Sequence, residues 1–506
     1  MKDSATTTAS TAYHYLWHLA ALGVLDQAPD GSVTSTLWDE IAARGDSRPA
    51  TVVMIDVGCS FDHPNLATRV DRDASIDFTA GPQGQRMGSK KDGIPACAFD
   101  GLDTSDLRLD GLSAKDQSLF DEVVQHLMTT RTGYRTTGNV EAMFASHGTA
   151  VAGLVVGGPE VQPDGSEPTQ GILPYFGVDP MSRLVSVRTG FEDDPLQFIA
   201  ALLYAKAQSP DVIVIPRGLP DPQAGTLAPK DDFQAELEQW QSSEAADLLH
   251  RIETLRKKAG GARPYAPQRS LTATRLWHLV AALLKAISNH VPVVCAAGNE
   301  GESQLLYPAS LATRENGIIA VGAVSSAGLR SGYGNYGEGL TLVAPSDDME
   351  VFNRHQMRLP PDDAAAHAAR RLASAQIVPL SSRSLLTTDV PGNFGYTEAP
   401  QPDAPGGYYA PFGGTSGAAA LVAGVIALVR RAERAADPQA AVRDGRDIRA
   451  LLTRTARHDI PDGAEPVALR GDTMNAASED AEALSVFFGA GLVDAAAAVH
   501  EVMTDK

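Results

Sequence analysis

Cysteine is scarce in this chain of 506 residues, which contains only Cys59, Cys97 and Cys295. An odd count without the spacing of metal ligands indicates neither a disulfide framework nor a zinc site. Cys59 and Cys295 lie in apolar, strand-like stretches, and we expect both thiols to be buried as small hydrophobic side chains.

Positive charge is also in short supply. Lys and Arg total 42 against 62 Asp and Glu, which gives a formal net charge of −20. Nucleic acids and anionic membranes are bound by clustered basic side chains. The charge balance therefore argues against both as partners.

Long apolar runs are missing as well. No run reaches the ~18 residues that a membrane-spanning helix needs. The small and apolar residues at 418–429 predict a buried helix instead. The first residues have neither the basic segment nor the small-residue cleavage site of a signal peptide. We therefore expect a cytoplasmic protein without a membrane partner.

The residues that are present are typical of a large globular protein, with 43% hydrophobic and 21% charged side chains. Apolar bursts alternate with helical patterns, which predicts an α/β fold with a parallel sheet. The predicted strands are 50–58, 183–190, 211–218, 291–299, 317–326 and 340–345, and the predicted helices include 194–208 and 271–290.

Three segments interrupt this alternation, at about 71–140, 220–262 and 350–382. The first is polar and turn-rich with a short amphipathic stretch, "SLFDEVVQHLMTT". The second has helical spacing around Trp240, and the third contains an Ala/Arg-rich helical pattern. We interpret them as surface elaborations of one core. Dedicated partner-binding sites are the alternative.

Four polar side chains stand at the ends of predicted elements. Asp56 closes a strand, Asn299 ends another, and His147 and Ser416 begin helical patterns. The carboxyl ends of parallel strands gather at one edge of the sheet, where open α/β proteins place their sites. Each residue alone has an ordinary interpretation as a turn or a helix cap. Their combination is more informative.

Together these groups supply the chemistry of acyl transfer. A serine hydroxyl is a weak nucleophile until an imidazole within hydrogen-bond reach takes its proton. The imidazole needs a carboxylate to fix its tautomer, and the oxyanion needs hydrogen-bond donors. A side-chain amide and the N–H at the start of a helix are two such donors.

The four segments resemble the motifs of the subtilisin-like serine proteases (subtilases), whose triad follows the order Asp, His, Ser. "VVMIDVGCSFDHPNL" is similar to the aspartate motif, "HGTAVAG" to the histidine motif and "AAGNEG" to the oxyanion motif. "GTSGAAALVAG" is similar to the serine motif, with Ala420 in the position of a usual proline. The resemblance extends from Trp38 to Val499.

This resemblance implies a three-layer subtilisin-like α/β fold, with a mostly parallel central sheet, helices on both faces and the three long insertions. It implies a peptidase domain at 38–506 after an N-terminal extension at 1–37. The implied substrate is a protein or a peptide. No cofactor is expected and no metal ligand is assigned. Calcium binding stays undetermined, because "GGPEVQPDGSEPTQG" replaces the loop that binds calcium in secreted relatives.

The resemblance also assigns roles. Asp56 would orient His147, which would act as general base and then as general acid. Ser416 would attack the scissile carbonyl, and Asn299 with the Ser416 N–H would bind the oxyanion. The implied substrate-binding segment is Pro216, Arg217 and Gly218.

Pro216 and Arg217 depart from the small polar residue and bulky apolar residue that are usual in that segment. Pro216 keeps a carbonyl but cannot donate. Arg217 would place a positive charge in the cleft wall and favour an acidic substrate side chain. The alternative is that Arg217 reaches solvent or pairs with a nearby carboxylate such as Asp193, Asp194 or Asp221.

Only 55 residues precede Asp56, which is short for the folding prodomain of secreted subtilases. We therefore expect a restricted or regulated endopeptidase, whose cleft is covered by an insertion or a regulatory protein partner, or whose substrate range is narrow. The helix around Trp240 is the candidate cover. The alternatives are a catalytically weak pseudoprotease scaffold and a transpeptidase that uses the same triad.

Overall fold

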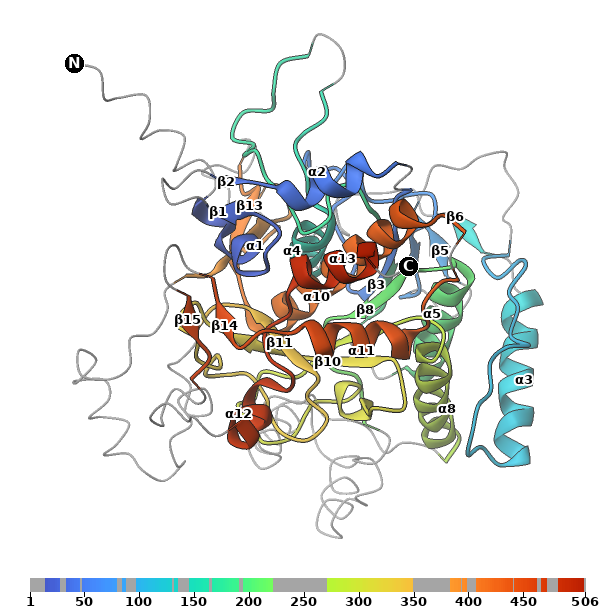
Figure 1. Ribbon diagram of the computed structural model, residues 1–506. Helices are drawn as coiled ribbons and strands as arrows, with labels where there is room; N and C mark the ends of the chain where they lie inside the picture. The colour runs from blue at the N-terminus through green and yellow to red at the C-terminus, as the bar shows by residue number, and fades with distance from the viewer. Residues whose placement is uncertain are drawn as a thin grey trace, which may run out of the picture.

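A nine-stranded sheet is the centre of the described part of the computed structural model (Figure 1). The structure describes residues 14–27, 33–45, 48–79, 84–87, 97–129, 132–134, 145–162, 166–190, 194–221, 271–348, 383–392, 394–397, 406–439, 441–461, 466–470 and 481–504. The strand order is β11-β10-β9-β8-β3-β7-β4-β5-β6. Only the β4–β5 pairing among these neighbours is antiparallel.

The central strands lie where the sequence predicts them, with shorter ends. They are β3 (Thr51–Asp56), β7 (Arg183–Arg188), β8 (Val212–Ile215), β9 (Val293–Ala296), β10 (Ile318–Val324) and β11 (Leu342–Pro345). They are almost fully buried, because both faces of the sheet are covered. The predicted parallel α/β fold is confirmed.

Alternate side chains of each strand enter two different cores. Val52 and Met54 of β3 pack into one apolar cluster, and Val53 and Ile55 pack into the other. Successive side chains of a strand point to opposite faces, so a run of buried apolar residues needs helices on both sides. The expected three-layer arrangement is confirmed.

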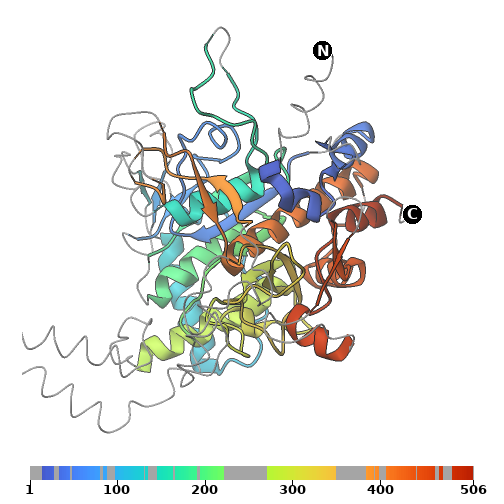
Figure 2. The same cartoon turned by 90° about the vertical axis from the view of Figure 1, so that its left-hand side faces the viewer.

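Helices α4 (Ser146–Val156), α10 (Gly414–Ala436) and α13 (Ala495–Thr504) cover one face, whereas α5 (Pro195–Ala207) and α8 (Leu271–Ser288) cover the other. Figure 2 shows the C-terminal helices in red and α8 in yellow-green on opposite sides of the molecule. Both predicted helices, at 194–208 and 271–290, are confirmed as α5 and α8.

Helix α10 is long and apolar enough to cross a membrane by length and composition alone, but its apolar window is entirely buried in the fold. The predicted buried helix at 418–429 is therefore confirmed as the central part of α10.

The first interrupting segment extends the edge of the sheet. It contributes β4 (Ile76–Asp77), β5 (Gln85–Arg86), β6 (Gly133–Tyr134) and α3 (Ala114–Thr129). The amphipathic stretch lies in α3, and Asp116 of α3 accepts a 2.7 Å hydrogen bond from Arg275 of α8. The helices expected around Trp240 and within 350–382 lie outside the described residues.

The described residues near the N-terminus join the core. They form η1 (His14–Leu16), α1 (Trp17–Ala21), β1 (Asp26–Gln27), β2 (Val33–Thr34) and α2 (Thr36–Ala43). Leu16 and Leu19 are buried in the larger apolar cluster. Trp17 Nε1 donates to the Ser384 carbonyl at 3.0 Å. His18 is also fully buried, and neither of its ring nitrogens has a partner among the described residues.

The remaining elements complete the C-terminal half. They are η4 (Ala309–Leu311), β12 (Leu385–Thr388), β13 (Tyr409–Phe412), α11 (Gly445–Thr455), β14 (Asp459–Ile460), β15 (Val467–Ala468) and α12 (Ala481–Phe488). The expected burial of Cys59 and Cys295 is confirmed, with 6% and 0% of their surface exposed.

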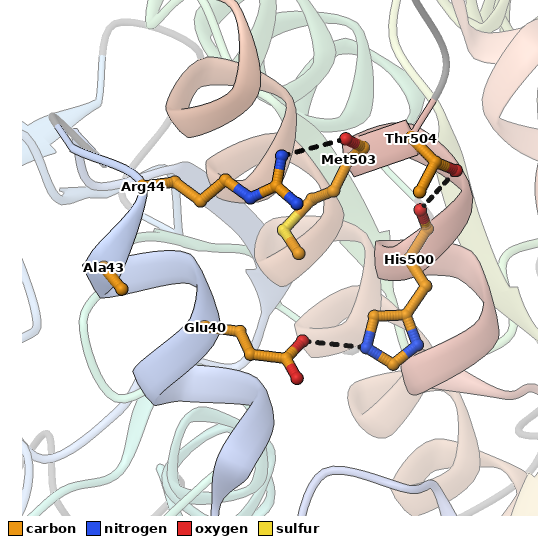
Figure 3. Close-up of a pocket in the computed structure, with 6 residues that line it drawn as sticks. All are labelled: Glu40, Ala43, Arg44, His500, Met503 and Thr504. Atoms are coloured by element: carbon orange, nitrogen blue, oxygen red, sulfur yellow. Dashed lines mark hydrogen bonds and ion pairs between the residues drawn. The ribbon is translucent and has the colours of Figure 1, made fainter.

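A surface hollow of about 540 Å³ lies between α2 and α13 (Figure 3). His500 and Glu40 join the two helices across it through a 2.8 Å hydrogen bond. Arg44 donates to the Met503 carbonyl at 3.1 Å. None of the predicted site residues lines this hollow.

Candidate active site

The carboxyl ends of three neighbouring strands bring most of the predicted residues to one edge of the sheet. β9, β8 and β3 are adjacent and parallel. Asp56 is the last residue of β3, Pro216 follows β8 directly, and Asn299 lies just beyond β9. The sequence-based expectation that these strand ends meet is confirmed.

Asp56 and His147 form a direct hydrogen bond. His147 is the second residue of α4, and its Nδ1 lies 2.7 Å from Asp56 Oδ2. Asp56 is 1% exposed, and its other oxygen accepts the Val57 N–H at 2.8 Å. Because a carboxylate only accepts, Nδ1 is the donor, and Nε2 is left to receive a proton.

A very close backbone approach places His147 next to Asp56. A Cβ atom on Gly148 would lie 1.9 Å from the Gly58 carbonyl oxygen, so only glycine fits there. Gly58 itself has φ +97°, a conformation that favours glycine. Phe412 meets the imidazole in an edge-to-face contact, with ring centroids 5.5 Å apart. The position of His147 is therefore fixed by the close backbone approach of Gly148 to Gly58 and by the contact of its ring with Phe412.

Ser416 is the third residue of α10 and is 8% exposed. Its hydroxyl donates to the Pro216 carbonyl at 2.7 Å. Ser416 and His147 make no hydrogen bond with each other in the part of the chain that the structure describes. The expected contact between nucleophile and base is thus replaced here by a contact between the nucleophile and the predicted substrate-binding segment.

Asn299 is oriented by the residue that precedes Ser416. Its Oδ1 accepts both the backbone N–H and the hydroxyl of Thr415, each at 2.9 Å. The Thr415 hydroxyl in turn accepts the Gly298 N–H at 3.1 Å. Because Oδ1 is the acceptor in both bonds, the Asn299 Nδ2 is left as a donor. This role of Thr415 was not predicted from the sequence, although its place beside Ser416 was a signal.

Most of the first backbone N–H groups of α10 already have a hydrogen-bond acceptor. The Gly414 N–H binds the Tyr333 hydroxyl at 2.9 Å, and the Thr415 N–H binds Asn299. The Gly417 N–H donates to the Gly413 carbonyl, as in the first turn of a helix. Within the described residues, only the Ser416 N–H of these four has no acceptor. Helix N-termini carry such donors toward anions.

Asn335 holds the turn that carries Asn299 and was also missed from sequence. Its Oδ1 accepts the N–H groups of Glu300 and Glu302 at 3.0 and 3.1 Å, and its own N–H donates to Gly298. Its Nδ2 donates to the Glu300 carboxylate at 2.8 Å. No pattern near the oxyanion motif indicated this distant partner.

Arg217 lies against the neighbouring helix. Its guanidinium carbon is 5.9 Å from the centre of the Phe198 ring, and Nη1 donates to Thr189 at 3.5 Å. Of the carboxylates considered as partners, Asp194 instead caps α5 by accepting the Leu196 and Gln197 N–H groups. Asp193 lies outside the described residues, whereas Asp221 lies within them, and neither Arg217 nor Asp221 is without a partner.

Two ionisable side chains in the segment that follows β3, Cys59 and His63, are buried. Burial raises the pKa of the Cys59 thiol to about 12, so it stays protonated at neutral pH and is a poor nucleophile. Burial lowers the pKa of His63 to about 4. The neutral His63 ring lies 2.8 Å from the Tyr408 carbonyl through Nε2 and accepts the Asn65 N–H through Nδ1. His63 therefore anchors the loop that follows β3.

Within the described ranges, no group of three or more His, Cys, Asp or Glu side chains is arranged to hold a metal ion.

Comparisons with known proteins agree with the motifs. The subtilase family model matches residues 47–491. The "Major intracellular serine protease" of Bacillus subtilis (strain 168) is 42% identical over 73 residues, which are 13% of this chain and 22% of that protein. This chain thus aligns with less than a quarter of the length of that relative.

Solved structures include a protease from Pseudoalteromonas arctica PAMC 21717, with 19% identity, 92% of this chain and 93% of that chain covered, and a TM-score of 0.45. A structure titled as a lanthipeptide protease has 15% identity, 98% and 97% coverage, and a TM-score of 0.49. The family assignment rests on the family model, which spans most of the sequence. The chain belongs to the subtilase family.

Proposed function

We propose that this protein is a serine endopeptidase that hydrolyses peptide bonds through an acyl-enzyme on Ser416. The observation that carries the proposal is the pair of donors left at the site, the Asn299 Nδ2 and the Ser416 N–H. The Asn299 Oδ1 already accepts two hydrogen bonds from Thr415, and the Ser416 hydroxyl already donates to the Pro216 carbonyl. Two fixed donors at a helix N-terminus are suited to a developing oxyanion.

The proposed reaction has two halves, acylation of Ser416 and hydrolysis of the acyl-enzyme. Ser416 Oγ leaves the Pro216 carbonyl, gives its proton to His147 Nε2 and forms a bond to the scissile carbon. The imidazolium is stabilised by Asp56 through the 2.7 Å bond. His147 then returns the proton to the amine as the C–N bond breaks. In the second half, a water molecule gives a proton to His147 and attacks the acyl carbon. His147 then returns the proton to Ser416 Oγ as the ester bond breaks, and the carboxylic acid product leaves. Hydrogen bonds of this kind are often formed only when substrate is bound.

The Pro216–Gly218 segment is proposed to bind the substrate backbone, and its contact with Ser416 supports this placement. We also propose that Arg217 favours an acidic substrate side chain. The Arg217 guanidinium contacts the Phe198 ring and the Thr189 hydroxyl, and Arg217 itself lies in the segment that follows β8. The alignment of 73 residues, 42% identical, with the "Major intracellular serine protease" of Bacillus subtilis supports our proposal of an intracellular location. We propose that the interrupting segments provide regulation, with a protein partner as one means.

Cleavage of a peptide mixture in H₂¹⁸O tests the reaction class. A hydrolase incorporates one ¹⁸O at each new C-terminus, and mass spectrometry locates it. Transfer to an added amine without ¹⁸O would indicate a transpeptidase. Intact peptides with the folded wild type would indicate a scaffold without activity. Ser416→Ala and His147→Ala are the inactive controls.

A further inference from the structure

The first turn of α10 rests on a buried tyrosine. Tyr333 follows β10 in the chain and is 1% exposed. Its hydroxyl accepts the Gly414 N–H at 2.9 Å and donates to Asp347 Oδ1 at 2.8 Å. Because a carboxylate only accepts, the single hydroxyl proton lies toward Asp347, and the hydroxyl oxygen is left to receive the amide proton. The directions of both hydrogen bonds are therefore determined.

Ser346 binds the other polar backbone group of Gly414. Its hydroxyl donates to the Gly414 carbonyl at 3.0 Å and lies 2.9 Å from the Tyr333 hydroxyl. The Asp347 carboxylate packs against the same turn, since a Cβ atom on Gly413 would lie 2.0 Å from its Oδ1. Gly414 has φ +73°, a conformation that glycine adopts readily. Three side chains thus hold the turn through which the chain enters α10.

The backbone of Tyr333 holds a second segment, the turn that carries Asn299. The Tyr333 carbonyl accepts the Gly301 N–H at 2.6 Å, two residues beyond Asn299. One residue therefore joins two segments, through its hydroxyl to the start of α10 and through its carbonyl to the turn after β9. These segments carry the two proposed oxyanion donors, the Ser416 N–H and the Asn299 Nδ2.

The two segments meet at Gly414. A Cβ atom on Gly414 would lie 3.1 Å from Asn299 Nδ2, so the backbone of this glycine borders that donor directly. The Ser416 N–H lies two residues further along the same helical turn. A displacement of Gly414 would therefore move both donors. Misplacing a catalytic group by ~1 Å costs about 10² in rate.

We propose that Tyr333 is a positioning residue that sets the distance between the two oxyanion donors, with Ser346 as a second support of Gly414. This inference rests on the proposed function. Oxyanion donors are effective because they are fixed before charge develops and need no reorganisation during the reaction. Burial, and next the Asp347 carboxylate, hold the pKa of the Tyr333 hydroxyl well above its ordinary value, so the hydroxyl keeps the proton that it donates.

Tyr333→Phe tests the inference, because it keeps the ring and removes the hydroxyl. We expect kcat to fall by about 10- to 10²-fold, less than the loss of a donor itself, while KM changes by less than about threefold. The donors act on the tetrahedral state more than on bound substrate, which is why the effect falls on kcat. Each kcat is expressed per active site titrated to completion with a fluorophosphonate, so unfolded protein is not counted. Ser346→Ala should give a smaller fall, about 2- to 10-fold, because the Tyr333 hydroxyl remains.

A double-mutant cycle with Asn299→Ala separates positioning from a general effect on the fold. If Tyr333 acts through the donors, removing its hydroxyl costs less once the Asn299 amide is absent. The double variant should therefore lose at least about threefold less in kcat than the product of the two single losses. A double variant that loses the full product would overturn the inference.

Tyr204→Phe is the matched control. Tyr204 is also fully buried, and its hydroxyl donates to the Ala74 carbonyl at 2.7 Å in the core on the other face of the sheet. The same substitution there should lower the thermal stability and leave kcat unchanged. An unchanged kcat in folded Tyr333→Phe would overturn the inference, as would a similar fall in Tyr204→Phe. If Tyr333→Phe does not fold, an unchanged kcat in Ser346→Ala overturns it instead.

Failure of the proposed function is a different result. In that case the folded wild type would cleave no peptide and would not react with a fluorophosphonate, and the inference would fall with it. A wild type that reacts and cleaves, together with an unchanged kcat in folded Tyr333→Phe, would reject the role of Tyr333 alone.

Discussion

Adding one methyl group to Gly148 should uncouple the imidazole from its carboxylate. The new Cβ would lie 1.9 Å from the Gly58 carbonyl oxygen, whereas ordinary C···O contacts are about 3.3 Å. Either backbone must therefore move by about 1.4 Å. Both belong to buried segments without a flexible side chain that could yield instead.

A shift of that size carries the 2.7 Å bond between Asp56 and His147 past the length at which a hydrogen bond persists. Misplacing a catalytic group by ~1 Å costs about 10² in rate, and losing the correct imidazole tautomer costs about 10⁴. We expect Gly148→Ala to lower kcat/KM by about 10² to 10⁴. Overpacking should lower the free energy of unfolding by about 1–3 kcal/mol.

The assay measures kcat/KM on one cleaved peptide beside a thermal unfolding curve. Gly334→Ala is the matched control, because a Cβ atom there would approach its nearest neighbour, the Ser331 carbonyl oxygen, no closer than 3.4 Å. It should keep both activity and stability. Full activity in a folded Gly148→Ala protein would refute the link from this close approach to the Asp56–His147 pair.

Four further substitutions test separate parts of the account. Asn299→Ala should lower kcat by about 10²–10³ with a small change in KM. Thr415→Val should lower kcat less, because the Thr415 N–H still holds Asn299. Arg217→Leu should lower kcat/KM selectively for peptides with acidic residues, and an unchanged peptide-library profile would reject that role. His18→Leu should remove an acid-sensitive loss of stability, because burial lowers the His18 pKa from 6.5 to about 3. From pH 6.5 downward the unfolded chain binds a proton that the folded chain refuses, so wild-type stability falls by about 3 kcal/mol at pH 4 relative to the variant. Urea unfolding of the wild type and His18→Leu at pH 7.5 and pH 4 measures this difference. An equal loss of unfolding free energy in both proteins would contradict it.

Much of the fold could be predicted from sequence because its signals are local. Buried parallel strands are continuous apolar runs, and β3 and β10 were visible as such. The four motif residues could be placed at element ends for the same reason. The meeting of Asp56 and Asn299 at one edge followed from the rule that parallel strands end there.

The contacts that decide the behaviour of the site were not visible in the sequence. The bond from Ser416 to Pro216 joins residues 200 positions apart. Leu306 contacts Gly218, which lies 88 positions before it. No periodicity encodes such distances. Thr415 was missed because a threonine before a serine is also ordinary helix-capping sequence.

The most direct measurement of the central claim is covalent labelling of the folded protein by a fluorophosphonate, with the modified residue identified by peptide mass spectrometry. The account predicts one adduct on Ser416, slower labelling in His147→Ala and none in Ser416→Ala. A folded wild type that is not labelled, or that carries the adduct on another residue, would contradict it.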